Sequence, residues 1–224
     1  MFELYLDSAD LEQIARFKDC LPLTGITTNP SILAGAGIGL RQFLAEANAI
    51  LGGNARFHVQ VVSTTVEAMV DEARKLHELP YDLVVKVPVT ERGLAAIKLI
   101  KADDIPLLGT AIYSVQQGFL AALSGADYLA PYVNRIDNSG VDGVKVVADL
   151  QLLLERQGLT SKILAASFKS TQQALAVMKC GIAAITLPLD VAGQIVTHPA
   201  VRQAVDQFGA DWQQAFGDRL SYES

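Results

Sequence analysis

The stretch DLVVKVPVT (residues 82–90) decides the fold of this chain. Its apolar residues surround one lysine, Lys86, and the run ends at Pro88 and Thr90. A short run rich in β-branched residues is typical of a strand that is buried on both faces, as in a parallel sheet. An ammonium group in such a strand is costly, because a buried charge must be paired or must shift its pKa. Lys86 therefore needs either a structural partner or a chemical role.

The composition fits one globular domain and excludes several classes of protein. Of the 224 residues, 50% are apolar, and 24 acidic side chains outnumber 18 basic ones to give a net charge of −6. This length suits a single α/β barrel. The sequence has no basic stripe of the kind that binds nucleic acid, and no apolar run approaches the roughly 20 residues of a membrane span.

The cysteines and histidines indicate neither a disulfide nor a metal site. Cys20 and Cys180 lie far apart in the sequence, which favours two reduced thiols. His58, His77 and His198 lack the spacing of metal ligands. The opening MFELYLD has neither the basic nor the apolar part of a secretion signal. We therefore expect a cytoplasmic protein that uses no metal and no cofactor.

Eight short β-rich runs alternate with segments of helical spacing. The runs cover residues 3–7, 24–29, 56–62, 82–88, 106–110, 127–133, 162–168 and 183–188. Such alternation predicts parallel strands joined by helical crossovers, and eight units close into a (β/α)8 barrel, the TIM barrel. The alternative is an open doubly wound sheet, which usually has a Gly-rich turn after its first strand; YLDSADLE (residues 5–12) has none. We predict one α/β barrel domain over residues 1–224, with an additional C-terminal helix over 199–218.

Capping residues predict where three helices begin. Thr64 and Glu67 have the spacing of a capping box before one amphipathic segment. Thr90 follows the fourth run, and Ser170 with Gln173 repeats the capping-box spacing after the seventh. Each cap comes directly after a predicted strand, which supports the alternation of strand and helix.

Polar side chains gather where the predicted strands end. In a barrel of this kind the chemistry lies at the C-terminal ends of the strands. The polar residues at these ends are Asp7, Thr27, Thr28, Asn29, Gln60, Lys86, Thr110, Tyr132, Asn134, Arg135, Ser167 and Asp190. Because the strands are otherwise almost purely apolar, we expect these side chains to form one site.

Side-chain alternation indicates which residues share a face with Lys86. If Lys86 points into the barrel, Val84 points inward too, while Val85 and Val87 face the helices. The same alternation places His58 with Gln60 and Ala130 with Tyr132. We interpret His58 as a residue beneath the site that tunes the pocket.

Two roles are open for Lys86. The structural role is an ion pair with Asp7 across the barrel. The chemical role is that of a nucleophile, because a low-dielectric pocket lowers the pKa of an amine and frees it to attack a carbonyl. The resulting iminium withdraws electrons from the neighbouring carbon, so that a C–C bond breaks or forms through an enamine. This is the chemistry of a class I aldolase, and it requires no metal.

Six ordered blocks of the sequence resemble the transaldolase family. They are ITTNPSIL (26–33), VVKVPVT (84–90), LGTAIYS (108–114), APYVNRID (130–137), LAASFKS (164–170) and ITLPLDVA (185–192). The resemblance extends over nearly the whole chain, from Asp7 to the region of Trp212 and Phe216. It implies that Lys86 is the lysine that forms the Schiff base.

The choice of branch within the family depends on two residues. Transaldolases carry a glutamate on the third strand and usually a phenylalanine on the sixth, whereas this chain has Gln60 and Tyr132. That pair is similar to the fructose-6-phosphate aldolases, which cleave fructose 6-phosphate to dihydroxyacetone and glyceraldehyde 3-phosphate. The resemblance implies that Tyr132 is the general acid/base and acts through a water held by Gln60 and Thr110, since a phenol titrates and a glutamine does not. A transaldolase acting on the same donor and a barrel that only binds a sugar phosphate are the alternatives.

The same resemblance implies roles for the other strand ends. Asp7 would lie beside the bond that breaks, and a guanidinium would grip the phosphate of the aldehyde. The implied substrate-binding residues are Asn29, Thr27 and Ala130 for the ketose, and Arg135 and Ser167 for the phosphate.

Each of these residues also has a structural explanation. Asn29 precedes Pro30 and would shape the turn. Arg135 would form a local ion pair with Asp137, which is worth little at a surface. Ser167 would serve as a small residue that permits close approach.

The tail of the chain predicts an amphipathic helix that begins at Pro199. Its apolar residues are Val201, Val205, Phe208, Trp212 and Phe216. Aromatic residues on a terminal helix indicate burial, either on the helix's own barrel or on another subunit. Small members of the transaldolase family form homodecamers of two stacked pentamers whose terminal helix docks on a neighbour, and the resemblance implies the same assembly here.

Overall fold

The structure is a computed structural model that describes residues 2–223, and within them eight parallel strands close into a barrel. Each strand pairs with the next along the chain, and β8 pairs with β1. The strands are β1 (Glu3–Asp7), β2 (Gly25–Thr27), β3 (Arg56–Gln60), β4 (Asp82–Pro88), β5 (Leu107–Ile112), β6 (Tyr128–Pro131), β7 (Lys162–Ala165) and β8 (Ala184–Leu187). The predicted (β/α)8 fold is therefore confirmed.

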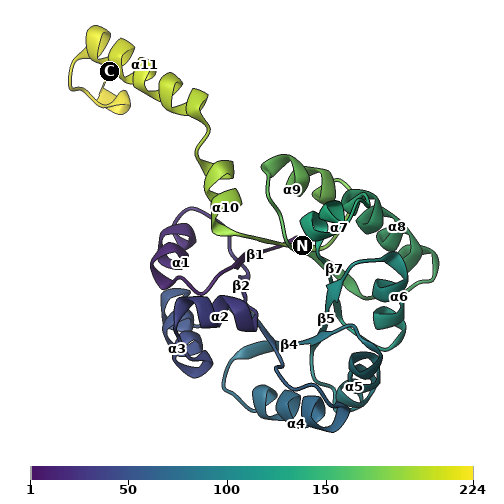
Figure 1. Ribbon diagram of the computed structural model, residues 1–224. Helices are drawn as coiled ribbons and strands as arrows, with labels where there is room; N and C mark the ends of the chain where they lie inside the picture. Colours follow the sequence, from purple (N-terminus) through teal and green to yellow (C-terminus); the bar gives the residue numbers. More distant parts are fainter. Residues whose placement is uncertain (1, 224) are drawn as a thin grey trace.

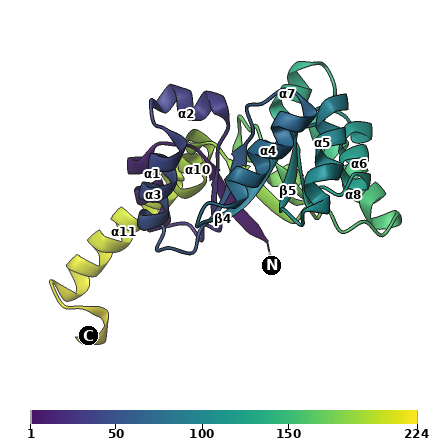
Figure 2. The ribbon, with the colours of Figure 1, turned by 90° about the horizontal axis from the view of Figure 1, so that it is seen from below.

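Helices form a ring around the strands (Figure 1). Those of the described chain are α1 (Leu11–Lys18), α2 (Pro30–Ala36), α3 (Leu40–Ile50), α4 (Val66–His77), α5 (Glu91–Ala102), α6 (Val115–Leu123), α7 (Val133–Asn138), α8 (Gly143–Arg156), α9 (Thr171–Met178), α10 (Leu189–Val196) and α11 (Pro199–Phe216), followed by the short 3-10 helix η1 (Ser221–Glu223). Two of them, α2 and α7, are short additions that begin shortly after β2 and β6 and lie on the same side of the barrel (Figure 2). Within residues 2–223 none of the helices combines the length and the apolar character needed to cross a membrane.

Several observed strands are shorter than the predicted runs, and most of the difference lies at their C-terminal ends. The affected runs are 24–29, 56–62, 127–133 and 162–168. β2 ends at Thr27 because the side chain of Asn29 already accepts the N–H of Ile32 as the N-cap of α2. In the same way Tyr132 is the N-cap position of α7. β5 instead continues past its predicted end to Ile112.

One of the three predicted helix caps is wrong by one residue. The N-cap of α4 is Thr65 and not Thr64, and the Thr65 hydroxyl accepts a backbone N–H of the first turn at 3.3 Å. Thr90 caps α5 as predicted. Ser170 caps α9, and it accepts the N–H of Gln173 at 3.1 Å. These caps fix the point at which each chain segment leaves the rim of the barrel.

The predicted alternation along the strands is confirmed by the two apolar clusters of the core. Val85 and Val87 pack in the cluster between the strands and the helices. The cluster inside the barrel consists of Tyr5, Val84, Leu108, Tyr128, Ala130, Leu164 and Ala184, with Tyr132 packed against it. The barrel interior is thus filled by side chains, and the site lies above this filling.

Helix α11 leaves the ring and projects away from the barrel (Figures 1 and 2). It begins at Pro199 as predicted and ends at Phe216, two residues before the predicted end. Trp212 packs against Phe216 with ring centroids 4.6 Å apart, and its indole N–H donates to the Arg219 carbonyl at 2.7 Å. The alternative in which this helix packs on its own barrel is therefore wrong.

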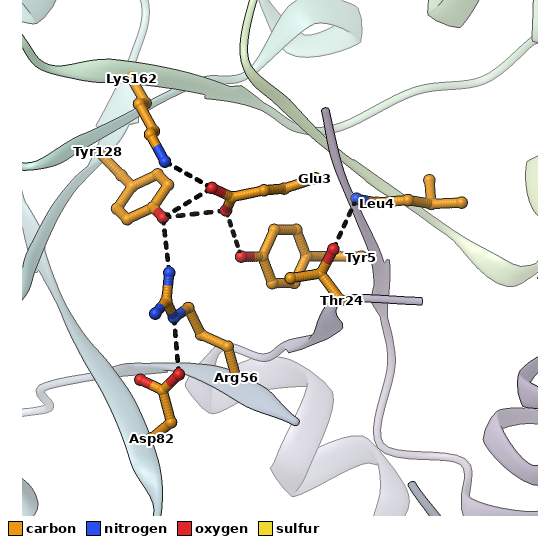
Figure 3. Close-up of polar contacts among 8 residues, drawn as sticks. All are labelled: Glu3, Leu4, Tyr5, Thr24, Arg56, Asp82, Tyr128 and Lys162. Carbon is orange, nitrogen blue, oxygen red and sulfur yellow. Dashed lines mark hydrogen bonds and ion pairs between the residues drawn. The ribbon is translucent and has the colours of Figure 1, made fainter. Parts of the chain in front are cut away.

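A polar network closes the N-terminal end of the barrel (Figure 3). Its centre is the Glu3 carboxylate, which accepts from the hydroxyls of Tyr5 at 2.6 Å and Tyr128 at 2.9 Å and from Lys162 Nζ at 2.6 Å. Burial alone would raise the pKa of Glu3, but the hydrogen bonds from Lys162, Tyr5 and Tyr128 outweigh it and hold the pKa below its ordinary value. Glu3 therefore stays ionised beneath the core.

The polar network around Glu3 forms the floor of the barrel, and Arg56 extends this floor to Asp82. Its Nη1 donates to the Tyr128 hydroxyl at 2.9 Å, and its Nε pairs with Asp82 at 3.0 Å (Figure 3). These residues stand at the beginnings of their strands. The two tyrosine hydroxyls thus point into the floor, and their rings face the layer above it.

His58 occupies that layer with its ring edge-on to both tyrosines. The ring centroids are 4.8 Å from Tyr5 and 5.1 Å from Tyr128. The side chain is fully buried, and neither ring nitrogen has a hydrogen-bond partner among residues 2–223. Burial, and then the positive charges of Lys86 and Arg56, lower the pKa of His58 well below its ordinary value. The imidazole is therefore neutral in the folded protein.

We expect His58→Phe to make the protein more resistant to acid. In the unfolded chain a histidine has a pKa of about 6.5. Below that pH the unfolded state therefore binds a proton at His58, whereas the folded state does not. Stability then falls as the pH drops below about 6.5. Between pH 7 and pH 5 this one group should cost about 2 kcal/mol of the free energy of unfolding. Phenylalanine fills the same space and removes that loss.

The measurement is urea unfolding of wild type, His58→Phe and the exposed-site control His77→Phe at pH 7 and pH 5, at one protein concentration. The loss on acidification should be about 2 kcal/mol smaller in His58→Phe than in wild type and His77→Phe. Equal losses in all three proteins would show that His58 titrates normally.

Candidate active site

Side chains of β1, β2 and β8 form a small hydrogen-bonded group of one carboxylate and two hydroxyls. The Thr27 hydroxyl donates to Asp7 Oδ1 at 2.7 Å and lies 2.8 Å from the Thr186 hydroxyl. Both threonines are buried. The prediction that Asp190 is the polar residue delivered by the eighth strand is wrong, because Asp190 is exposed in the first turn of α10 and its side chain accepts the N–H of Val191. Alternation along AAITLP was the signal that could have identified Thr186.

Lys86 lies inside the barrel wall with only 5% of its surface exposed. Its Nζ donates to the Thr28 carbonyl at 2.6 Å. None of the ion pairs among residues 2–223 joins it to Asp7. Burial lowers the pKa of Lys86, and the field of Asp7 raises it by less. The amine is therefore held by one neutral acceptor and not by a carboxylate, which disfavours the structural role.

Gln60 is the neighbour of Lys86 on the adjacent strand. The register of β3 and β4 pairs Gln60 with Lys86 and, two residues earlier, His58 with Val84. Gln60 thus ends β3 at the level of the amine. An amide donates and accepts hydrogen bonds without changing its charge. This position can orient a small molecule beside Lys86, but it cannot transfer a proton.

The next two strands position a pair of hydroxyl groups, that of Thr110 on β5 and that of Tyr132 directly after β6. The Thr110 hydroxyl is 2.8 Å from the Tyr132 hydroxyl. Ala111 adopts a left-handed backbone with φ of 57°, and the β5–β6 register shifts between Gly109 and Ile112. Such a bulge bends the strand at the point where Thr110 meets its partner, and bulges are frequent next to active sites.

The phenol of Tyr132 is neutral in the resting protein. Burial raises its pKa above the ordinary value, and the field of Asp7 adds to this. The hydrogen bond with Thr110 and the charge of Arg135 act in the opposite direction without reversing the shift. A group of this kind can release or take up a proton when the charge beside it changes.

Arg135 sits on the open side of Tyr132. Its guanidinium carbon is 5.0 Å from the centroid of the Tyr132 ring, and its Nη1 donates to the Tyr113 hydroxyl at 3.5 Å. The Tyr113 ring packs edge-on to Tyr132 with centroids 5.8 Å apart. Tyr113 is a site residue that the strand-end analysis missed. It follows the fifth strand directly, and its place within LGTAIYS was the available signal.

The local ion pair suggested for Arg135 is not formed. Asp137 instead accepts the N–H of Gly143 at 2.7 Å, and its other oxygen accepts from the Gln173 amide. The Arg135 guanidinium is exposed at the mouth of the barrel. It therefore keeps donors that are directed to solvent.

Ser167 and Asn29 lie at the rim, Ser167 in a left-handed backbone conformation and Asn29 as a helix cap. Ser167 has a left-handed backbone with φ of 63°, which is uncommon for a residue with a side chain, and its carbonyl accepts the N–H of Asn134 at 2.7 Å. Asn29 Oδ1 caps α2 at 3.0 Å, so the turn-shaping explanation holds for this oxygen while its NH2 group is a separate donor. Ala130 lies in the inner cluster, next to Tyr132 along the wall.

The barrel end thus holds an amine of lowered pKa, a carboxylate, a neutral phenol and a guanidinium. An unprotonated amine attacks carbonyl carbons, and a phenol at hydrogen-bond distance from another hydroxyl can take part in proton transfer. A guanidinium with free donors binds an anion such as a phosphate. Among residues 2–223 there is no cluster of His, Cys, Asp and Glu that could hold a metal ion.

Comparison with known proteins gives one family and several structures. The model of the family described as transaldolase/fructose-6-phosphate aldolase matches residues 4–221 of this chain. Three of the similar solved structures share 11–18% sequence identity with the chain, so they support the fold alone.

A flavocytochrome b2 variant with bound sulfite has a TM-score of 0.62 at 11% identity; the alignment covers 87% of this chain and 58% of that one. A mandelate oxidase variant has a TM-score of 0.57 at 13% identity and coverages of 97% and 74%. Thiamine phosphate pyrophosphorylase from Pyrococcus furiosus has a TM-score of 0.53 at 18% identity and coverages of 96% and 98%. This chain therefore spans a little over half of the flavocytochrome b2 chain.

Proposed function

The chain belongs to the transaldolase/fructose-6-phosphate aldolase family, and from this premise we propose that it is a class I aldolase that reversibly cleaves fructose 6-phosphate to dihydroxyacetone and glyceraldehyde 3-phosphate. The family makes the chain an enzyme of the aldolase/transaldolase type that works through a Schiff base. The finer assignment rests on the residues around Lys86.

One observation carries the role of Lys86. The amine is buried, has a lowered pKa and donates to a backbone carbonyl, not to a carboxylate. It attacks the C2 carbonyl of the ketose, and the Tyr132 phenol gives its proton to the hydroxyl that leaves as water, so that an iminium and a phenolate form. The bond between C3 and C4 then breaks with its electrons moving toward the iminium nitrogen, while the C4 hydroxyl proton goes to the Tyr132 phenolate. Glyceraldehyde 3-phosphate leaves, and an enamine remains on Lys86.

The second half of the reaction favours cleavage over transfer. Protonation of the enamine at C3 and addition of water release dihydroxyacetone and the free amine. Tyr132, paired with Thr110 at 2.8 Å, supplies that proton through a water oriented by Gln60. The glutamine stands where a transaldolase would carry its titratable glutamate, so proton transfer falls to the phenol.

The remaining strand ends hold the substrate. Asp7 and the NH2 group of Asn29 bind hydroxyls of the ketose, while Thr27 orients Asp7 through its hydrogen bond. Ala130 leaves room for the substrate beside Tyr132. Arg135 and Ser167 hold the phosphate of the aldehyde. The silent barrel that only binds sugar phosphates is disfavoured, since simple binding gives no reason to bury an amine of lowered pKa.

A transaldolase acting on fructose 6-phosphate is the second candidate, and the family includes it. The two activities differ in the fate of the enamine on Lys86. A transaldolase keeps it until a second aldehyde arrives, while an aldolase protonates it and releases dihydroxyacetone.

The partition of products tests this choice. Wild type should form free dihydroxyacetone from fructose 6-phosphate alone, at a rate above that of sedoheptulose 7-phosphate formation when erythrose 4-phosphate is added. Tyr132→Phe should lose about 10²–10⁴-fold in cleavage rate because the general acid/base is gone, whereas the remote control Tyr81→Phe should keep it. Gln60→Glu should move the balance toward transfer. Transfer that dominates in wild type by a wide margin would make the chain a transaldolase.

Our proposal includes a cytoplasmic location, which two free cysteines support. Cys20 is exposed and Cys180 is partly buried, and neither is in a disulfide. Unpaired thiols are typical of a reducing compartment.

We further propose a homodecamer of two pentamers, assembled through α11. The apolar stripe of this projecting helix is exposed, with 60% of Val201, 58% of Val205 and 67% of Phe208 accessible. A stripe of this kind needs a partner surface. The barrel offers a largely apolar cavity of about 680 Å³, which is lined mainly by Leu4, Leu21, Leu23, Ile185, Leu187 and Ile195. The occupant that we assign to it is the α11 stripe of a second copy.

Light scattering tests the assembly. The wild-type mass should be ten times the 24.0 kDa of one chain. Phe208→Glu and truncation before Asp211 should lower the mass, because a charge or a missing turn disrupts an apolar contact. Gln203→Glu, on the polar side of the same helix, should not. A wild-type monomer at micromolar concentration would exclude this assembly.

A further inference from the structure

Three side chains from two neighbouring segments form one stack at the mouth of the barrel. Tyr132 and Arg135 belong to the β6–α7 segment, and Tyr113 follows β5. The Arg135 guanidinium carbon lies 5.0 Å from the centroid of the Tyr132 ring, within the range of a cation–π contact. The residue proposed to bind phosphate thus touches the residue proposed to move the proton.

From this stack we infer that an anion on Arg135 sets the proton affinity of Tyr132, so that the substrate's own phosphate switches the phenol between base and acid. Tyr113 is the positioning residue that holds the guanidinium over the ring. This inference rests on the proposed function, because it uses the phosphate site and the proton-transfer role assigned there.

Tyr113 fixes the stack from two sides. Its hydroxyl accepts from Arg135 Nη1 at 3.5 Å, and its ring packs on the Tyr132 ring at 5.8 Å and 70°. Arg135 is otherwise a long exposed side chain, whose rotamers cost entropy to restrain. A contact with both partners keeps the guanidinium near the ring when no ligand is bound.

The groups facing Tyr132 come from several elements of the barrel. Burial raises its pKa. The Thr110 hydroxyl on β5 and the charge of Arg135 in α7 lower it, while Asp7 on β1 and Tyr113 raise it. Arg135 is the cation of this set and stands exposed at the mouth, within reach of an incoming anion. A phosphate dianion on Arg135 would offset the field that favours the phenolate.

The direction of this effect suits both halves of the reaction. The phenol gives its proton to the hydroxyl that leaves as water when the iminium forms, so Tyr132 is a phenolate when the C3–C4 bond breaks. While the phosphorylated aldehyde is still attached, Arg135 is neutralised, so this phenolate is a stronger base for the C4 hydroxyl proton. Once glyceraldehyde 3-phosphate has left, Arg135 is free again and Tyr132 becomes the stronger acid. The proton taken from the C4 hydroxyl then passes to C3 of the enamine, and the addition of water that frees the Lys86 amine returns a proton to the Tyr132 phenolate.

Ultraviolet difference titration of the tyrosine hydroxyls tests the inference on the resting enzyme. Subtracting the titration curve of Tyr132→Phe isolates the contribution of Tyr132. Saturating inorganic phosphate should lower the ionisation constant of Tyr132 about 2–5-fold, as expected for the loss of a cation–π partner. Sodium chloride at the same ionic strength serves as the blank, since salt alone screens charges.

Variants identify the residues that carry the effect. Arg135→Gln should lower the ionisation constant without phosphate and abolish the response to phosphate. Tyr113→Phe keeps the ring and loses the acceptor, so the response should shrink. Tyr81→Phe, which removes a hydroxyl from a ring packed on Phe57 at the far end of β4, should respond like wild type.

Calorimetry with inorganic phosphate separates the two ways in which the inference can fail. If phosphate binds wild type and not Arg135→Gln, but the ionisation constant of Tyr132 does not move, the coupling is wrong and the proposed function stands. If phosphate does not bind wild type at all, the phosphate role of Arg135 is wrong and the coupling fails with it. A phosphate response that persists in Arg135→Gln would also overturn the inference.

Discussion

The desolvation of Lys86 is the constraint on which the rest of this structure depends. A lysine on an inner barrel wall loses most of its hydrogen bonds to water. In their place Lys86 has a hydrogen bond to the Thr28 carbonyl. The ammonium form is therefore disfavoured, and the field of Asp7, whose carboxylate accepts from the Thr27 hydroxyl, compensates only in part. The same burial that makes this lysine unfavourable for stability makes it reactive toward a carbonyl.

The packed interior of the barrel keeps water away from Lys86 on the N-terminal side. The apolar layer around Val84, Leu108 and Leu164 fills the interior, and the floor centred on Glu3 closes the opposite end with satisfied ion pairs and hydrogen bonds. His58 stands between the two as a neutral polar ring without a partner in the described chain. The hydrogen bonds and ion pairs of the floor thus lie at the N-terminal end of the strands, while the C-terminal end carries the reactive groups, as in other barrels of this class.

The sequence predicted the barrel and much of its inner wall, because both follow from local patterns. β-branched runs, caps and the alternation around Lys86 each depend on a few adjacent residues. What it missed depends on pairing across the barrel. Alternation along AAITLP marks Thr186 as an inward residue, but no local pattern shows its pairing with Thr27, 159 positions away in sequence. The floor likewise joins the beginnings of strands that lie far apart in the sequence. Tyr113 was missed because its place within LGTAIYS was the only local signal, and its partners Tyr132 and Arg135 come from the next strand segment. The cap of α4 was wrong by one residue because Thr64 and Thr65 are chemically equivalent and only the backbone path distinguishes them.

The central claim is that Lys86 is the residue that forms the covalent bond with the ketose. Borohydride reduction of the enzyme with dihydroxyacetone, followed by peptide mass mapping, tests it most directly. The account predicts one stable addition, on the peptide that contains Lys86, with loss of activity in proportion and no addition in Lys86→Met. Labelling of a different lysine, or an active enzyme that is not labelled at all, would contradict it.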